Sequence, residues 1–371
     1  MARLSILIAP DSFKECLTAR AVAEAIAEGI RRAWPEALPR ALPLSDGGEG
    51  LLDCLAGTLE VEERASEVTG PDGSPRSVRW LFEPAAHRAW IEVAEVIPLS
   101  AVGSKRVGAA TSRGVGELIR IAANHGAKRV ALGIGGTGTV DGGAGCLIGL
   151  GAAVCEAGGV ALDPGSARLG EVRSVRLERG GLPEVELLCD VRSPMVGPRG
   201  AAHLYGPQKG LGVEGAAQVD QRLRAWGRVL DAGFGCDPSE LPFAGAGGGL
   251  AGALMAACGA VPRSGIERLA EHLQLDEAIQ RATIVVTGEG RTDEQSREGK
   301  VIDHVLSRAK ELARPVQVIS GRIEPDAVRW LASRGARAHA CSPAHLSESE
   351  AIARAEELLI SAAYELFAPE R

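Results

Sequence analysis

The sequence predicts an α/β fold divided between two domains, and three observations support this. Short apolar runs alternate with stretches of helical periodicity along the chain, the pattern of strands connected by helices. A chain of 371 residues is too long for one ordinary hydrophobic core. Polar motifs that contain an acid follow several of the apolar runs, as expected where parallel strands end at a ligand site.

The N-terminal segment contains the clearest strand and helix. Residues 4–10 (LSILIAP) form a short apolar run that is typical of a buried strand. A helix follows, because apolar residues recur every four positions from Val22 to Trp34, and Thr18 is placed to cap it. Residues 40–45 (RALPLS) predict a second strand.

The rest of the chain continues the alternation. Residues 116–126 predict a helix that leads into a strand at 129–134. Ser347 and Glu350 form a capping box for a last helix that extends to about Phe367. Further strands are predicted at 185–190, 283–288, 315–320 and 336–342.

Composition and charge narrow the class of protein. The net charge of −7, with acids and bases interspersed, disfavours nucleic acid or an anionic membrane as a partner. No apolar stretch is long enough to span a membrane, and the N-terminal run is too short for a signal peptide. The eight cysteines lack a C-x-x-C motif and disulfide-like spacing. We therefore expect a cytoplasmic protein with reduced thiols and with neither nucleic acid nor membrane as a partner.

A glycine-rich loop at residues 133–145 (GIGGTGTVDGGAG) is the first candidate site. Glycine lets the backbone turn sharply and bring its N–H groups close to an anion. Gly133, Gly135 and Gly138 fit the dinucleotide motif G-x-G-x-x-G, and Glu156 could serve as its ribose-binding acid. A tight strand-to-helix turn without a ligand is the other alternative, since the stretch after the loop begins poorly as a helix.

Acids and bases gather near the same predicted strand ends. Carboxylates are ligands for Mg²⁺, although a single aspartate also often caps a turn. The acids at strand ends are Asp11, Asp46, Asp141, Asp190, Glu289 and Asp293. The basic residues near these loops are Lys14, Arg199, Lys209, Arg291 and Lys300.

A second glycine cluster lies at residues 243–254 (FAGAGGGLAGAL), at the start of a predicted helix. It could cradle phosphates through its backbone N–H groups, or allow the helix to pack closely on its neighbour. Two glycine-rich turns with several acids and cations favour phosphoryl transfer over hydride transfer. The chain lacks the P-loop, protein-kinase, H-E-x-x-H and G-x-S-x-G motifs, which excludes those standard sites.

Six motifs, in order, resemble the bacterial glycerate kinase family of the glycerate 2-kinase type. They are IAPDSFKECLTA (8–19), SDGGEG (45–50), GIGGTGTVDGGAG (133–145), CDVRSPMVGPRGAAHLYGPQKG (189–210), AGAGGGLAGAL (244–254) and VVTGEGRTDEQSREGKV (285–301). The resemblance implies transfer of the γ-phosphate of ATP to glycerate, which yields 2-phosphoglycerate and ADP, with Mg²⁺. It also implies two α/β domains, one flavodoxin-like or Rossmann-like and the other inserted.

Mapped onto this chain, residues 1–70 and 270–371 would form the flavodoxin-like domain, and residues 71–269 the inserted domain. The partners would be glycerate and ATP, and the chain could form a homodimer.

Two loops differ from the family pattern. Residues 137–141 (TGTVD) replace a Ser-Ala-Thr-Asn-Asp stretch, and residues 192–194 (RSP) replace an acid and an asparagine before the proline.

The resemblance and the strand-end motifs together lead us to assign roles. Lys14, with either Lys209 or Lys300, would hold phosphates, and Asp46 or Asp141 would accept the hydroxyl proton. The expected catalytic residues are Lys14, Asp46, Asp141 and Asp190. The expected nucleotide-binding residues are Gly135, Gly136, Thr137, Lys209, Gly247, Gly248 and Lys300. The expected substrate-binding residues are Asp11, Ser12 and Arg291, and the metal ligand is Asp190 or Asp293.

Three other functions remain open at this stage. The first is a kinase for a related small hydroxy acid. The second is an NAD-dependent dehydrogenase that uses the G-x-G-x-x-G loop. The third is a non-catalytic small-molecule sensor that keeps the fold without turnover.

Overall fold

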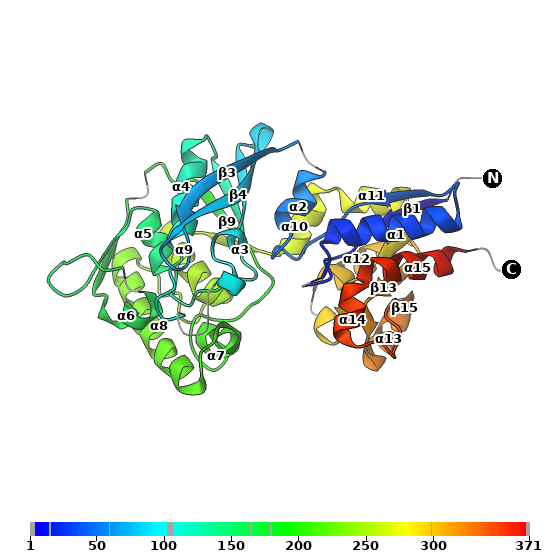
Figure 1. Cartoon of the computed structure of the whole chain (residues 1–371). Coiled ribbons are helices and arrows are strands. Elements are labelled where there is room, and N and C mark those ends of the chain that lie inside the picture. The colour runs from blue at the N-terminus through cyan, green and yellow to red at the C-terminus, as the bar shows by residue number, and fades with distance from the viewer. Residues whose placement is uncertain are drawn as a thin grey trace. The chain divides into compact units, whose positions relative to one another are not determined.

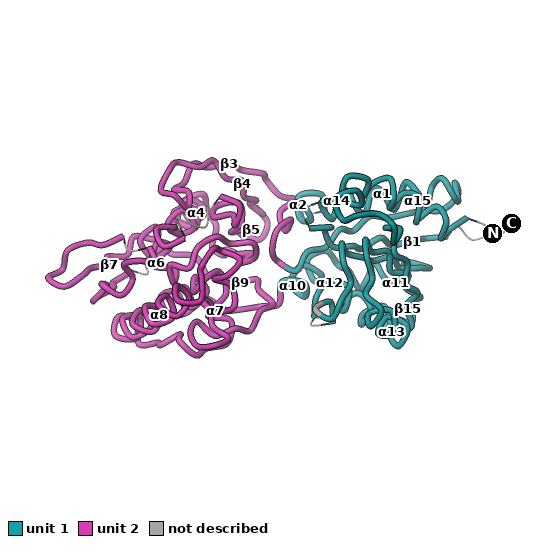
Figure 2. Tube along the Cα trace, turned by 60° about the horizontal axis from the view of Figure 1, so that its bottom comes forward, with its two compact units in different colours: residues 1–46, 53–59, 265–371 teal, residues 47–52, 60–264 magenta. Residues whose placement is uncertain are grey.

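The computed structural model describes residues 4–14, 16–58, 60–101, 107–163, 165–178, 180–297 and 299–368. The chain folds into two compact units made of helices and strands (Figure 1). Unit 1 consists of residues 1–46, 53–59 and 265–371, and unit 2 of residues 47–52 and 60–264 (Figure 2). The α/β fold with two domains is therefore confirmed.

Unit 1 is built on a parallel sheet with the strand order β2-β1-β11-β13-β15. Renumbered along the chain, this is the order 2-1-3-4-5 of flavodoxin-like sheets. Helices cover both faces, with α1, α14 and α15 on one side of the strands and α11, α12 and α13 on the other (Figure 2). The strands are β1 (Ser5–Ile8), β2 (Leu38–Ala41), β11 (Ile284–Thr287), β13 (Val316–Ser320) and β15 (Ala336–Ala340), with a separate pair β12 (Arg291–Thr292) and β14 (Arg322–Ile323). The helices are α1 (Ala19–Ala33), α10 (Gly265–His272), α11 (Leu275–Arg281), α12 (Val301–Glu311), α13 (Pro325–Ser333), α14 (Glu348–Ala353) and α15 (Ala355–Phe367).

Helix α1 forms as its sequence predicts. The Thr18 side chain accepts a hydrogen bond from the Ala21 N–H, and Val22, Ile26 and Ile30 are fully buried in the core of unit 1. Helix α1 packs closely on α15, since a Cβ on Gly29 would lie 2.3 Å from the Ile360 carbonyl oxygen. Glycine at this position thus allows the two helix backbones to approach.

Two elements of unit 1 differ from the sequence prediction. Strand β2 ends at Ala41, whereas we expected a strand at 40–45; Leu42 and Leu44 are fully buried but lie beyond the ladder. The capping box of Ser347 and Glu350 is present, but the last helix is interrupted at Arg354. An apolar run or a helical pattern of apolar residues predicts which residues are buried. It does not predict where the last hydrogen bond between two strands forms, or where a helix is interrupted.

Unit 2 contains a six-stranded sheet with the order β10-β9-β6-β5-β4-β3. Strands β5, β6, β9 and β10 are parallel, and β3 and β4 form an antiparallel hairpin at one edge. The strands are β3 (Glu62–Thr69), β4 (Pro75–Glu83), β5 (Arg88–Glu92), β6 (Arg129–Gly133), β9 (Glu184–Leu188) and β10 (Val261–Arg263), with a separate pair β7 (Ala153–Cys155) and β8 (Ser174–Arg176). The helices are α3 (Val93–Val96), α4 (Arg113–Asn124), α5 (Ala144–Gly149), α6 (Gly165–Arg168), α7 (Ala201–Tyr205), α8 (Val213–Phe234) and α9 (Leu250–Cys258).

The unit boundaries differ from the expected ones at residues 70/71 and 269/270. Strand β3 ends at Thr69, and its pairing with β4 places it in the sheet of unit 2. Residue 270 lies inside helix α10, which belongs to unit 1 from its first residue. The chain passes from unit 2 to unit 1 within helix α2 (Leu51–Ala56), because residues 47–52 belong to unit 2 and residues 53–59 to unit 1.

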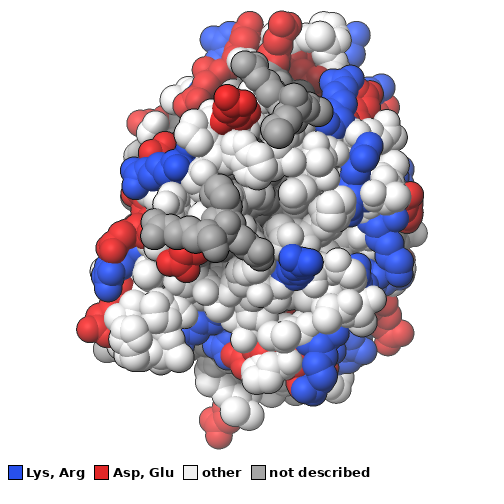
Figure 3. Space-filling model, turned by 90° about the vertical axis from the view of Figure 1, so that its right-hand side faces the viewer, with Lys and Arg blue, Asp and Glu red and all other residues white. Residues whose placement is uncertain are grey.

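The surface carries charges of both signs. On the face shown in Figure 3, Lys and Arg side chains alternate with Asp and Glu around the rim, and the centre is mostly uncharged. The eight cysteines, which all lie in the described ranges, are thiols and not disulfides. Over the described ranges, no helix is both long and apolar enough to cross a membrane.

Candidate functional site

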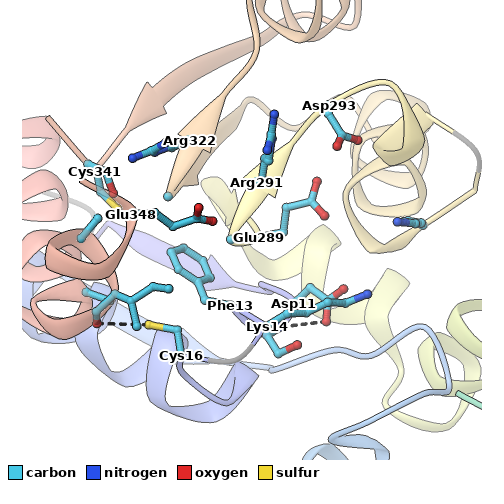
Figure 4. Close-up of a pocket in the computed structure, with 18 residues that line it drawn as sticks. Asp11, Phe13, Lys14, Cys16, Glu289, Arg291, Asp293, Arg322, Cys341 and Glu348 are labelled. Atoms are coloured by element: carbon cyan, nitrogen blue, oxygen red, sulfur yellow. Dashed lines mark hydrogen bonds between the residues drawn. The ribbon is translucent and has the colours of Figure 1, made fainter. Parts of the chain in front are cut away.

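Unit 1 contains a cavity of about 350 Å³ at the carboxyl ends of β1, β11, β13 and β15 (Figure 4). In an open α/β sheet, ligands bind outside the carboxyl ends of the strands, where the strand order reverses. That reversal lies between β1 and β11 in unit 1, and residues that follow both strands line the cavity. Topology and cavity therefore point to the same candidate site.

Several predicted residues meet around this cavity. Asp46 lies near these residues, because its charge raises the pKa of Asp11. Ser12 donates its backbone N–H to the Asp11 carboxylate over 2.7 Å, and Arg291 forms an ion pair with Glu324 over 2.6 Å. The predicted residues that line the cavity are Asp11, Ser12, Lys14, Arg291, Asp293 and Lys300.

Asp11 is the most perturbed acid of the cavity. Its side chain is only 7% exposed, and burial, followed by the neighbouring charge of Asp46, raises its pKa to about 7. Glu289 adds to the rise, whereas the Ser12 N–H and the Lys14 ammonium oppose it. A carboxyl group with a pKa near 7 can both lose and accept a proton at neutral pH, as a general base must.

Glu289 is a half-buried acid beside Asp11, and its sequence position predicted no specific role for it. Burial raises its pKa, and hydrogen bonding to the Ser296 hydroxyl and the charge of Lys300 oppose the rise. Ser296 also accepts the Asp293 N–H over 3.0 Å, so one hydroxyl connects both acids. This network fixes the loop after β11 at the edge of the cavity.

The remaining cavity wall was not found from the sequence. Phe13 and Cys16 are adjacent to predicted residues, but nothing in the motif indicates that they face a cavity. The other missed lining residues come from later segments and are Gly290, Gly321, Arg322, Cys341, Ser342, Glu348, Ala351, Ile352 and Ala355. The available signals were the position of Arg322 just beyond the predicted strand 315–320 and that of Cys341 at the end of the predicted strand 336–342.

The other predicted residues belong to unit 2. Lys209 is only 3% exposed, and its Nζ donates to the Thr139 carbonyl over 2.7 Å and to Thr137 Oγ1 over 3.4 Å. Burial lowers the pKa of Lys209 to about 7, although the charge of Asp141 opposes this. Lys209 thus holds the loop after β6 within unit 2, and the phosphate contact that we expected of it stays a prediction.

The buried Lys209 should make stability depend on pH. The unfolded chain keeps this proton up to about pH 10.5, whereas the folded protein releases it near pH 7, so stability rises with pH between these values. From pH 7 to pH 9 we expect a gain on the order of 2 kcal/mol, which Lys209→Met should abolish. Urea unfolding of both proteins at the two pH values measures this. An unchanged pH dependence in the variant would contradict a buried, neutral lysine.

Asp141 is enclosed by hydrogen-bond donors of unit 2, and the catalytic role that we expected of it stays a prediction. Its side chain is fully buried and accepts hydrogen bonds from Ser112 N–H and Ser112 Oγ, both over 2.8 Å. It also accepts the N–H groups of Gly143 and Gly145 over 3.1 and 3.3 Å. These four hydrogen bonds connect the Asp141 carboxylate to the starts of α4 and α5.

The two glycine-rich loops pack against each other. A Cβ on Gly248 would lie 2.1 Å from the Thr139 carbonyl oxygen, and the Gly142 N–H donates to the Gly248 carbonyl over 3.1 Å. Gly247 and Gly248 are both buried with positive φ angles of 65° and 72°. Gly247 and Gly248 therefore allow close backbone packing, which is the alternative that the sequence left open, and the phosphate cradle stays a prediction.

The beginning of the loop after β6 is more open. Gly135 is half-buried and Gly136 is exposed, whereas Thr137 is buried beside Lys209. The NAD interpretation loses support here, because α5 has six residues and Glu156 follows β7, which pairs with β8 in a separate two-stranded sheet. Glu156 therefore does not follow a strand next to β6, where the ribose-binding acid of a dinucleotide fold lies.

Asp190 begins the loop after β9, in which this sequence differs from the family. Asp190 is half-buried, Ser193 Oγ lies 3.0 Å from the Tyr205 hydroxyl oxygen, and the Arg192 guanidinium stacks on Phe243. Val140, the other difference, is fully buried in the apolar core of unit 2. Position 140 thus contributes to packing in this chain.

A metal site is the remaining question. The two expected ligands, Asp190 and Asp293, belong to different units. In the ranges that the structure describes, no group of three or more His, Cys, Asp and Glu side chains is arranged to hold a metal ion. Mg²⁺ needs only one or two carboxylates when substrate phosphates and water complete its shell. Asp293, beside Glu289 in the cavity wall, has the right oxygen chemistry for such a site.

Comparisons with known proteins agree over almost the whole chain. A model of the glycerate kinase family matches residues 6–369. The glycerate 2-kinase of Escherichia coli (strain K12) is 38% identical over 331 residues, covering 87% of this chain and 86% of that protein. The glycerate kinase of Bacillus subtilis (strain 168) is 36% identical, with the same two coverages. A crystal structure of a Salmonella typhimurium LT2 protein assigned as glycerate kinase 2 matches with a TM-score of 0.83 at 35% identity, over 99% of this chain and 98% of that one. This protein therefore belongs to the glycerate kinase family.

Proposed function

We propose that this chain is an ATP-dependent glycerate 2-kinase, which converts glycerate and ATP to 2-phosphoglycerate and ADP. The observation that carries the proposal, besides family membership, is the cavity of unit 1. It combines Lys14 and Lys300, which suit phosphate, with Asp11, whose pKa of about 7 suits proton transfer.

In the proposed reaction, the C2 hydroxyl oxygen of glycerate attacks the γ-phosphorus of ATP. The new P–O bond forms as the bond to the β,γ-bridging oxygen breaks, ADP leaves, and the hydroxyl proton passes to the Asp11 carboxylate. Lys14 and Lys300 bind and neutralise the phosphoryl oxygens, which is the main protein contribution to such transfers. Asp293 would hold Mg²⁺ together with the phosphates, and the ion would supply further positive charge.

The direct test separates the product from its isomer. Purified protein is incubated with ATP, Mg²⁺ and D-glycerate, and ADP release is followed. Enolase without phosphoglycerate mutase then converts only 2-phosphoglycerate to an enol phosphate that absorbs ultraviolet light. ADP without this absorbance would contradict phosphorylation at C2.

A panel of substrates addresses the other functions. ADP release with another short hydroxy acid, but not with glycerate, would identify a kinase for that acid. Ligand binding without ADP release would identify a sensor, and reduction of NAD by a hydroxy acid would identify a dehydrogenase. Omission of the divalent metal should abolish ADP release.

Lys14→Ala should lower kcat/KM by about tenfold to a hundredfold. A charge-assisted bond to phosphate contributes on the order of 1.5–3 kcal/mol, which corresponds to this range. Lys14→Arg should restore only part of the loss, because a planar fork does not replace a compact ammonium group. Lys310→Ala, at an exposed lysine of α12 outside the cavity, is the matched control. Steady-state kinetics measure all three variants, and unchanged kcat/KM in folded Lys14→Ala would exclude a phosphate contact.

A further inference from the structure

The cavity of unit 1 has two chemically different ends (Figure 4). Asp11, Glu289 and Asp293 lie at one end, and the charge of Lys300 acts on Glu289 there. Cys16 and Cys341 lie at the other end, with Phe13 between the two groups. The cavity is thus charged at one end and largely apolar at the other.

Helix α14 and the start of α15 complete the apolar end. Cys16 Sγ lies 3.5 Å from the Ile352 carbonyl oxygen, which places this segment beside Cys16. Ala351 and Ala355 are buried there, and the Ile352 side chain is 41% exposed. Burial raises the pKa of the Cys341 thiol to about 11 and also raises that of Cys16, so both thiols are neutral at pH 7. Apart from Arg322 and Glu348 near its rim, this end presents an uncharged surface.

Glycines keep the cavity floor free of side chains. A Cβ on Gly288 would lie 1.7 Å from the Ile319 carbonyl oxygen, and one on Gly321 would lie 2.3 Å from the Gly290 carbonyl oxygen. The loops after β11 and β13 are therefore in backbone contact where they pass beneath the cavity. Gly290 and Gly321 line the cavity at this contact.

We propose that this cavity binds the nucleoside triphosphate, with the base against the apolar end and the phosphates at the end that holds Lys14 and Lys300. The assignment rests on the proposed kinase function and specifies its nucleotide site. It keeps the phosphate contacts that we expected of Lys14 and Lys300, but it takes the nucleotide away from the other expected residues, Gly135, Gly136, Thr137, Lys209, Gly247 and Gly248. The nucleotide then lies where we expected Asp11, Ser12 and Arg291 to bind the acceptor.

Size and chemistry favour a nucleotide over the acceptor. A volume of about 350 Å³ falls in the ~300–1,000 Å³ range of pockets for drug-sized ligands, larger than a three-carbon acid requires. Glycerate is polar at every carbon and has no apolar surface to bury against Ile352, Ala351 and Ala355. A nucleotide has an apolar planar base and charged phosphates at opposite ends, which matches the two ends of the cavity.

Competition experiments on the full-length protein test both ends. A fluorescent ADP carrying a methylanthraniloyl group is bound first, and adenosine or inorganic tripolyphosphate is added to displace it. Ile352→Asp places a carboxylate against the base and should weaken adenosine competition by about tenfold or more, with tripolyphosphate competition within twofold. Lys14→Ala should show the opposite pattern. Val328→Asp, at a valine of α13 that is 45% exposed and outside the cavity, should change neither.

Other results would overturn the proposal. If Ile352→Asp leaves adenosine competition unchanged in a protein with a normal thermal melt, the base binds elsewhere. If Ile352→Asp instead raises KM for glycerate alone, the cavity belongs to the acceptor. Ile352→Ser provides a second test if the aspartate variant fails to fold, with the same direction of effect. The site and the proposed function can fail separately. If the wild-type protein binds nucleotide as described but never forms ADP, the nucleotide site stands and the kinase function is wrong. If it forms ADP but does not bind nucleotide as described, the kinase function stands and this site is wrong.

Discussion

Replacing Asp11 with asparagine should lower kcat by about 10²- to 10⁴-fold, the range contributed by a general base. The amide is almost the same size and can still accept the Ser12 N–H, but it cannot take up a proton at neutral pH. KM for ATP should change less than kcat. Steady-state kinetics measure the effect, and Asp326→Asn, at an exposed aspartate of α13 outside the cavity, is the control. A variant with wild-type kcat would show that Asp11 is not the base.

The pH profile tests Asp11 against a purely structural role. If ionised Asp11 is required, kcat/KM of the wild type should rise with pH through about 7, and Asp11→Asn should lack this rise. Removing the like charge in Asp46→Asn should move the rise to lower pH. Removing the cation in Lys14→Ala should move it to higher pH. Shifts in these opposite directions would not follow from a general loss of structure.

The same titration predicts a gain in stability from Asp11→Asn. The unfolded carboxyl ionises near pH 3.8 and the folded one near 7, so the folded state binds the extra proton in between. Wild-type stability therefore falls as pH rises through this window. Asp11→Asn lacks this fall. The free energy of unfolding of the variant, relative to that of the wild type, should therefore grow by on the order of 2 kcal/mol from pH 5 to pH 8. Thermal unfolding at the two pH values measures it, and no change in the difference would contradict the raised pKa.

Local patterns account for what could be predicted of the site. Asp11, Ser12 and Lys14 directly follow β1, and Arg291 and Asp293 follow β11, so the strand prediction already places them at the carboxyl edge of a sheet. Parallel strands that are neighbours bring such loops together. The fold class followed from the same alternation of strands and helices.

Long-range packing accounts for what could not be predicted. Ile352 reaches the cavity only because α14 packs beside the loop after β1, a contact between residues far apart in the chain. The sequence predicts a phosphate contact for Lys209, and only the structure shows that this lysine is buried against the loop after β6. Asp141 follows a predicted strand, as a catalytic aspartate would, but only the structure shows that Ser112 from another segment binds its carboxylate. Sequence patterns locate a carboxylate at a strand end, whereas tertiary contacts decide whether it meets solvent.

Asp141→Ala should lower the stability of the protein by on the order of 3–5 kcal/mol, because it removes the acceptor of four buried donors. The N–H groups of Ser112, Gly143 and Gly145 would be left without a partner in the interior. Asp141→Asn should cost less, since its amide oxygen can keep the three donors that now bond to Oδ2.

Thermal unfolding followed by tryptophan fluorescence measures the loss at Asp141, and one of the five tryptophans, the buried Trp226, donates its indole N–H to the Gly142 carbonyl over 2.8 Å in this loop. Asp163→Ala is the control, because that aspartate is exposed and its ion pair with Arg113 over 3.6 Å is worth no more than about 0.5 kcal/mol. If Asp141 were instead the proton acceptor, Asp141→Ala would melt like the wild type and lose kcat. A stable but inactive variant would therefore contradict the structural role, whereas early unfolding with kcat retained at low temperature would support it.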